Sequence, residues 1–94
     1  MNRYRLRTTK RFDKSVKRCI RRNYPIDELR KVMSLLVETG SLPMQYRPHK
    51  LKGKKGNETW ECHIQPDWLL VWEQHDEELI MLMMDTGTHS DLFG

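Results

Sequence analysis

Three histidines and one aspartate of this sequence are residue types that can move protons at neutral pH. His49 lies in a basic segment, His63 on the polar side of an alternating stretch, and His89 in the run Thr-Gly-Thr-His-Ser near the last residue. Asp67 follows His63 by four positions. Because imidazole titrates near neutral pH, two histidines can serve one reaction as acid and base. We therefore take these four residues as the catalytic candidates.

Cleavage of RNA is a reaction that needs little more than such a set. The 2′-hydroxyl of RNA can attack the adjacent phosphate once a base removes its proton, cations stabilise the developing charge, and an acid protonates the leaving 5′-oxygen. No metal or other cofactor is required by this route. Two other interpretations stay open: the histidines are unrelated surface residues, or they bind a metal, although they share no short HxH, HxxxH or HExxH spacing.

Further residues are candidates for substrate contacts. Glu61 shares a predicted strand face with His63, where it either orients that histidine or pairs with a charge on a neighbouring strand. Trp68 and Phe93 are candidates for stacking on RNA bases. The alternatives are a core position for Trp68 and anchoring of the C-terminal tail for Phe93.

The first half of the chain predicts a strand followed by two helices. Apolar or β-branched residues alternate with arginines over 3–8, which indicates a strand. A very basic amphipathic helix should follow, capped by Thr8 or Thr9. Asn23-Tyr24-Pro25 interrupts it, Asp27 is the expected N-cap of a second helix, and Gly40 its end.

The second half predicts a basic loop and then strands. Residues 41–57 have prolines, glycines and many lysines, which favours a loop; strands are expected at 58–65, 68–74 and 78–85. The order β-α-α-β-β-β predicts a single α+β domain over 1–94. Two N-terminal helices would pack on a mostly antiparallel four-stranded sheet, followed by a short C-terminal helix or tail. In such a sheet the ends of neighbouring strands would bring His63, Asp67 and His89 to one rim.

The charges are divided between the two halves of the chain. All 17 Lys and Arg residues lie at or before Lys55, together with only four acids, so residues 1–57 carry a net charge of +13. Residues 58–94 contain nine acids and no Lys or Arg. Solvated helix faces would explain many lysines, but this separation favours a polyanionic partner held by the first half.

Cysteine content and hydropathy point to an intracellular protein. Cys19 and Cys62 form no CxxC pair, and we expect both to be packed, reduced thiols. The longest apolar runs have five and six residues, whereas a helical membrane span needs roughly 20. No secretory signal is visible, so we expect no membrane association and a cytoplasmic location.

Three stretches together resemble one known family. They are His49-Lys50-Leu51-Lys52-Gly53, the run from Glu61 to Trp72 that reads ECHIQPDWLLVW, and the closing TGTHSDLFG from Thr86 to Gly94. The sequence resembles the YafQ-type branch of the RelE toxins, and the resemblance spans nearly the whole chain in length and element order.

The resemblance implies a RelE-like fold and a type II toxin that cleaves mRNA on the ribosome and is neutralised by a cognate antitoxin protein. A toxin–antitoxin heterotetramer is one possible assembly. Carried over position by position, the resemblance makes His49, His63, Asp67 and His89 catalytic. It places Phe93 on the RNA with Trp68 beside the catalytic residues, and Glu61 matches an acidic position of the family.

At Trp60 the sequence departs from the family, where an arginine that could steady the phosphate is common. The cation would then come from Lys50, Lys52 or Lys54. We expect the antitoxin on the basic surface of residues 3–22 and 47–55, because a neutraliser must compete with a polyanion. Two other functions remain open: a ParE-like toxin that binds a topoisomerase without RNA chemistry, and a nucleic-acid-binding regulator.

Overall fold

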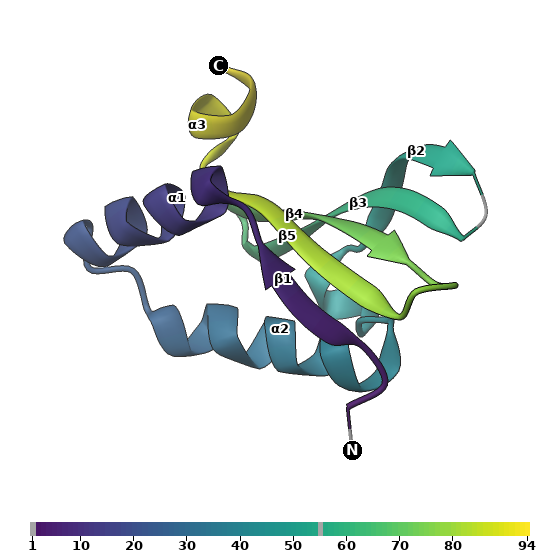
Figure 1. The fold of residues 1–94 in the computed structure, drawn as a ribbon. Helices are drawn as coiled ribbons and strands as arrows, with labels where there is room; N and C mark the ends of the chain where they lie inside the picture. Colours follow the sequence, from purple (N-terminus) through teal and green to yellow (C-terminus); the bar gives the residue numbers. More distant parts are fainter. Residues whose placement is uncertain (1, 55) are drawn as a thin grey trace.

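The computed structural model describes residues 2–54 and 56–94 and contains one mixed sheet with three α-helices (Figure 1). The five strands have the order β1-β5-β4-β3-β2, and only the β1·β5 pair is parallel. The elements are β1 (Arg5–Thr8), α1 (Lys10–Arg21), α2 (Ile26–Thr39), the 3-10 helix η1 (Met44–Tyr46), β2 (His49–Lys54), β3 (Asn57–Gln65), β4 (Trp68–His75), β5 (Ile80–Gly87) and α3 (His89–Phe93).

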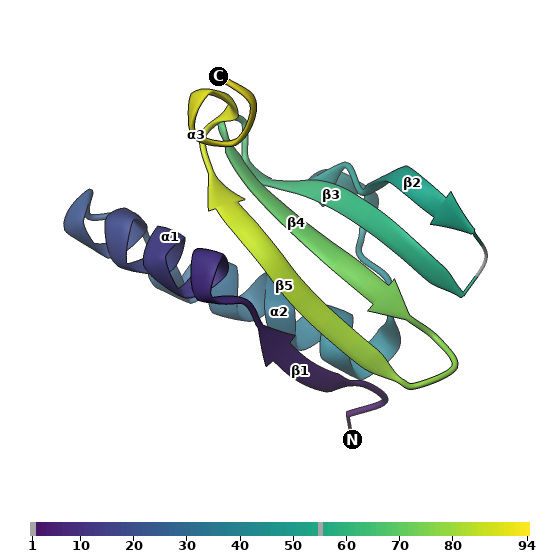
Figure 2. The same cartoon turned by 45° about the horizontal axis from the view of Figure 1, so that its top comes forward.

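The two long helices cover one face of the sheet. Figure 2 looks onto the other face, which carries only α3 at one end. The core lies between the helices and the covered face, and burial of its apolar side chains supplies the main drive for folding. Its largest fully buried side chains include Leu29, Val32 and Leu36 of α2 together with Cys62, Trp68, Leu70, Trp72, Met81 and Met83 of the sheet.

The predicted α+β class and the two N-terminal helices are confirmed, but the sheet has five strands rather than four. The additional strand, β2, lies within the segment 41–57 that we expected to be a loop, and every residue of β2 is exposed. An edge strand that is rich in lysine buries no apolar face, so it carries no alternating hydrophobic signal. Lys55, part of the same expected loop, lies outside the described residues.

Two of the three predicted helix ends are confirmed, the N-cap of α1 and the end of α2. The Thr9 side chain accepts a hydrogen bond from the Phe12 backbone N–H at 3.0 Å, and Gly40 ends α2 with φ +77°. The expected cap at Asp27 is wrong, because α2 already begins at Ile26 with Pro25 as its N-cap. Proline fixes φ near the helical value, so the chain enters the helix earlier, and Asp27 lies in the first turn.

Both cysteines are free thiols and buried, as expected. Burial raises the pKa of the Cys62 thiol to about 12, so this group stays protonated at neutral pH and is a poor nucleophile. No helix within residues 2–54 and 56–94 is long and apolar enough to span a membrane.

Candidate active site

The strand register brings the three candidate histidines to one end of the sheet, on the face that the long helices leave uncovered. His49 is the Cα partner of Glu61, and His63 is the partner of Leu69, which in turn pairs with Gly87 just before α3. The ring centroids of His49 and His63 are 6.5 Å apart, and those of His63 and His89 are 5.8 Å apart. His63 is therefore the middle member of a row of three imidazoles.

Asp67 holds His89 by two hydrogen bonds from the turn between β3 and β4. Its Oδ1 accepts the backbone N–H of His89 at 2.9 Å and contacts Nδ1 of the ring at 2.7 Å. The backbone bond and then the ring bond lower the pKa of the Asp67 carboxyl below its usual value. Since an ionised carboxylate can only accept, the ring proton is on Nδ1 and Nε2 is directed elsewhere.

His63 is tied to its turn in the same way. Its Nδ1 lies 3.3 Å from the carbonyl oxygen of Pro66. A carbonyl oxygen only accepts, so Nδ1 is the donor and Nε2 is the ring nitrogen left for chemistry. The turn of residues 66 and 67 thus fixes the orientation of two histidines, one through a carbonyl and one through a carboxylate.

His49 differs because both of its ring nitrogens face oxygen atoms. Nδ1 is 3.2 Å from the carbonyl oxygen of Arg47, and Nε2 is 3.1 Å from Oε1 of Glu61. With Glu61 ionised, both oxygens can only accept, so both contacts are hydrogen bonds when each ring nitrogen carries a proton. Glu61 is buried, and its second oxygen has no hydrogen-bond partner among the described residues.

Glu61 therefore orients His49 and not His63. Of the two roles open for Glu61, pairing with a charge on a neighbouring strand is the one that the structure contains.

The fourth histidine, His75, pairs with Glu73 at 3.0 Å at the opposite end of β4 and takes no part in the row. Within residues 2–54 and 56–94, no group of three or more His, Cys, Asp or Glu side chains is arranged to hold a metal ion.

The lysines of β2 divide between the two faces of the sheet. Lys50 is paired with Trp60 and contacts Glu58, at 3.7 Å, on the helix-covered side. A bulge separates Lys52 from Lys50, and Lys52 pairs with Thr59. By alternation along β3, Thr59 lies on the same face as His63, so Lys52 is on the side of the histidines. Lys54, the last residue of β2, pairs with Asn57 and lies farther from the rim. Lys52 is thus the β2 lysine whose position best fits the expected role of a cation beside the phosphate.

Trp60 lies on the helix-covered side of β3 and not on the histidine face. Its ring stacks on Trp72 at 6.3 Å, packs against the core and donates to Glu58. An arginine at this position would start from the covered face of β3. The loss of that arginine therefore removes no cation from the row of imidazoles.

Of the two aromatic candidates, one is buried and one is exposed. Trp68 is 1 % exposed, lies edge-on to Tyr24 and donates its indole N–H to Thr86. Of the two roles open for Trp68, the core position is the one that the structure contains, and so buried a ring has no face free for a base. Phe93 of α3 is 64 % exposed beside the row of histidines.

Two arginines that were not among the site candidates from the sequence border the histidine face. Arg47 lines a small cavity with His63, and Arg11 of α1 lines a groove with Phe93. Spacing along the chain gives no signal for either residue, because both are single members of long basic segments. Only the positive φ of Arg47, +49°, marks its place in a tight turn before β2.

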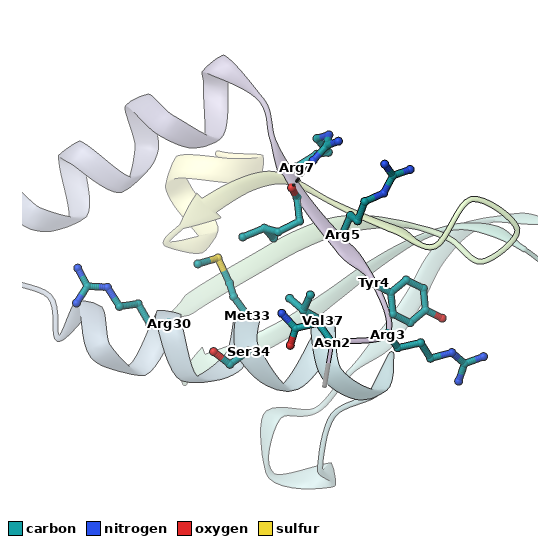
Figure 3. Close-up of a pocket in the computed structure, with 10 residues that line it drawn as sticks. Asn2, Arg3, Tyr4, Arg5, Arg7, Arg30, Met33, Ser34 and Val37 are labelled. Carbon is teal, nitrogen blue, oxygen red and sulfur yellow. Dashed lines mark hydrogen bonds between the residues drawn. The ribbon is translucent and has the colours of Figure 1, made fainter.

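A larger cavity than those beside the histidines lies elsewhere, between β1 and α2. It measures about 650 Å³, and Figure 3 shows Met33 and Val37 of α2 facing the strand. Basic side chains surround this apolar floor. The lining residues are Asn2, Arg3, Tyr4, Arg5, Leu6, Arg7, Arg30, Met33, Ser34 and Val37. The groove lies along the edge strand β1, whereas the histidine row begins on the other edge strand, β2, and crosses β3 to reach α3.

Comparison with known proteins gives matches over nearly the whole chain. The family model described as a bacterial toxin of type II toxin–antitoxin systems, YafQ, matches residues 4–94. The chain is 35% identical over 85 residues to the mRNA interferase toxin YafQ of Escherichia coli, with 88% of each protein covered.

Solved structures resemble the whole fold. A chain of the E. coli DinJ–YafQ toxin–antitoxin complex superposes with a TM-score of 0.83 at 31% identity, covering 98% of this chain and 99% of that one. An archaeal RelE–RelB complex from Pyrococcus horikoshii gives a TM-score of 0.77 at 12% identity, covering 92% and 94%. The second likeness establishes a RelE-like fold and nothing beyond it.

Proposed function

Because this chain belongs to the YafQ family of bacterial type II toxins, we propose that it is an endoribonuclease that cleaves mRNA with its three histidines. The observation that carries the proposal is the row of His49, His63 and His89, with Asp67 bonded to the last of them. It stands on the face that the long helices leave open, where a strand of RNA has access.

In the proposed reaction, His63 and His89 share the acid and base duties. Each is tethered through Nδ1, so each presents Nε2 to the substrate. One accepts the proton of the 2′-hydroxyl as its oxygen attacks phosphorus, and the other protonates the 5′-oxygen as the P–O5′ bond breaks. The products are a 2′,3′-cyclic phosphate end and a 5′-hydroxyl end, and no proton is gained or lost overall.

His49 has a different part in this proposal. Its contact with the buried Glu61 suits a protonated ring, and in that form it places positive charge beside the phosphate as negative charge develops there. Lys52 adds a second cation from the same strand. Such groups are most effective where they are fixed before the reaction, and the register of β2 on β3 fixes His49.

We propose two kinds of macromolecular partner. The substrate is mRNA engaged on the ribosome, which would hold the message in the single-stranded form that an open site needs. The neutralising partner is a cognate antitoxin, since the similar E. coli protein was solved in a toxin–antitoxin complex. We place the antitoxin in the groove between β1 and α2, where an apolar floor with an arginine rim fits an acidic amphipathic segment.

Cleavage of a translated message tests the catalytic assignment. His63→Ala and His89→Ala should each slow cleavage by about 10²-fold or more, the usual contribution of a positioned acid or base. His75→Ala is the matched control, because His75 lies away from the row and should leave the rate unchanged. Cleaved ends are mapped by primer extension in a translation extract, with and without a chelator that binds transition metals and spares the Mg²⁺ that ribosomes need.

Each outcome bears on one assignment. Parental cleavage by both variants would refute the proposed roles, whereas no cleavage by the parent chain itself would fit the ParE-like alternative, in which the histidines are dispensable. Loss of cleavage on chelation would instead indicate a metal-dependent route. Cleavage that persists with chelator and is lost only in the two histidine variants supports the route through protein side chains alone.

A further inference from the structure

A groove beside the histidine row combines an exposed aromatic ring, an apolar floor and one cation. It measures about 210 Å³ and is lined by Arg11, Leu51, Val71, Met84, Asp85, Leu92 and Phe93. These residues come from α1, three strands and α3. Phe93 is 64 % exposed and Leu51 44 %, so the groove presents apolar surface to solvent. Exposed apolar surface of this kind commonly marks a binding site.

The cation of this groove is held in place by a buried acid. Nε of Arg11 lies 3.0 Å from Oδ2 of Asp85, whose side chain is 12% exposed, whereas that of Arg11 is 73% exposed. The other oxygen, Oδ1, accepts from the Ser15 hydroxyl at 2.5 Å and from the Thr86 backbone N–H at 2.8 Å. Three contacts therefore hold the Asp85 carboxylate in place, and the carboxylate directs the exposed guanidinium of Arg11 toward the groove.

The sheet register connects the groove to the catalytic row. Val71 of β4 is the Cα partner of both Glu61 on β3 and Asp85 on β5. The carboxylate that holds His49 and the carboxylate that holds Arg11 thus flank Val71 on one face. Two strand spacings separate them, about 10 Å. A strand of RNA that leaves the histidines across Val71 next meets Arg11.

The basic surface continues beyond Arg11. A second cavity of about 300 Å³ shares Arg11 and Asp85 with the groove and runs onto α1, where Lys14, Arg18 and Arg21 line it. Arg11 is the basic residue that lines both cavities. It lies where a path for phosphates would pass from the site onto the helix.

We propose that this groove is a subsite for a nucleotide next to the scissile phosphate, in which Phe93 stacks on the base and Arg11 binds the phosphate. Arg11 thereby supplies a cation on the histidine face that neither position 60 nor Lys50 can provide from the covered side. The inference rests on the proposed function for its substrate, single-stranded RNA. Aromatic stacking combined with a guanidinium on the backbone is a general mode of binding such chains.

Binding of RNA that cannot be cleaved tests Arg11 apart from catalysis. The probe is a ten-nucleotide 2′-O-methyl RNA with a fluorescent end, and anisotropy gives the affinity at several salt concentrations. Arg11→Gln should weaken binding about fivefold near 0.1 M salt and reduce the slope of log K against log salt by about 0.7, the value for one phosphate contact on a single strand. Arg11→Lys should keep most of the slope.

Lys17→Gln is the matched control, because it removes one charge from an exposed position of the same helix that borders neither cavity. It should leave the slope unchanged. Equal effects of Arg11→Gln and Lys17→Gln would mean a diffuse basic field and would overturn the subsite, as would parental binding by Arg11→Gln. Thermal unfolding of each variant verifies that the fold is retained.

Cleavage by the parent chain in a translation extract is measured alongside. If the parent cleaves nothing while the Arg11 effect on binding is present, the subsite stands and the proposed nuclease fails. If the parent cleaves and Arg11→Gln loses neither affinity nor cleavage rate, the nuclease stands and the subsite fails.

Discussion

The carboxylate of Asp67 accepts two hydrogen bonds from a single residue, so its ionisation reports whether His89 is in place. The backbone N–H of His89 is the larger cause of the lowered Asp67 pKa, and the ring is the second. In His89→Ala only the backbone bond remains. The Asp67 pKa should therefore rise in this variant but stay below the value of about 3.9 for a free aspartate.

Carbon-detected NMR of the Asp67 carboxyl group, titrated in the parent and in the variant, measures this change. His63→Ala is the control, because His63 is bonded to Pro66 and not to Asp67, and it should leave the Asp67 titration unchanged. An Asp67 pKa that is the same in the parent and in His89→Ala would mean that the ring of His89 is not held as the structure has it.

At the scale of single residues, the sequence predicted which side chains lie together better than how they are oriented. The meeting of His63, Asp67 and His89 was predicted from residue type and strand ends, and His49 was added by the family resemblance. The partner of Glu61 could not be predicted, because it depends on how β2 pairs with β3. The burial of Trp68 was likewise open, since alternation defines two faces but does not say which face the helices cover.

Helix α3 carries both His89 and Phe93, and its first turn is held by one acid. Asp91 accepts the backbone N–H of Thr88 at 2.9 Å in a capping box and pairs with Arg22 at 2.7 Å. Gly87 is needed beside it: its φ is +153°, and an added Cβ would approach Oδ2 of Asp91 to 2.7 Å. The element that positions the histidine therefore depends on contacts outside the site.

Asp91→Asn should lower the free energy of unfolding at pH 7 by about 1 kcal/mol, typical for loss of a cap. The pKa of Asp91 is held well below its usual range, by Arg22 first and then by the Thr88 backbone N–H. A carboxylate whose pKa is lowered in the folded state stabilises the fold above about pH 4. This stabilisation is lost as the pH falls toward the pKa of the folded state. The difference between parent and variant should therefore shrink near pH 3.

Urea unfolding at about pH 7 and pH 3 measures this difference. Asp27→Asn provides the control, because Asp27 also lies in the first turn of a helix, but its side chain is 94% exposed and pairs only with Arg30. It should change stability little at either pH. An Asp91→Asn effect of the same size at both pH values would show that the charge of Asp91 does not hold α3.

Among the elements, the helices and the three C-terminal strands were predicted to within a few residues, whereas β2 was not. The reason is physical: α1, α2 and β3 each bury a periodic set of apolar side chains, and β2 buries none. Its pairing is determined by the neighbouring strand, including a bulge between Lys50 and Lys52. A pattern confined to one segment cannot contain that information.

For the whole molecule, the division of charge predicted a polyanionic partner but could not separate two basic surfaces. The fold puts the arginines of β1 and the lysines of β2 on opposite edges of the sheet. The β2 edge adjoins the histidine row, and the β1 edge borders the groove between β1 and α2. One basic surface predicted from the sequence is therefore two in the structure, and each can serve a different acidic partner.

Charge reversal at each edge should separate the two partners. Arg5→Glu with Arg7→Glu on β1 should weaken antitoxin binding by at least about tenfold through like-charge repulsion, and should leave cleavage by the unbound toxin unchanged. Lys52→Glu with Lys54→Glu on β2 should slow cleavage and leave antitoxin binding unchanged. Titration calorimetry with the cognate antitoxin and the cleavage assay measure the two effects. If the β2 pair abolished antitoxin binding while the β1 pair retained it, the antitoxin would dock over the active site, and neutralisation would be direct occlusion of the histidines.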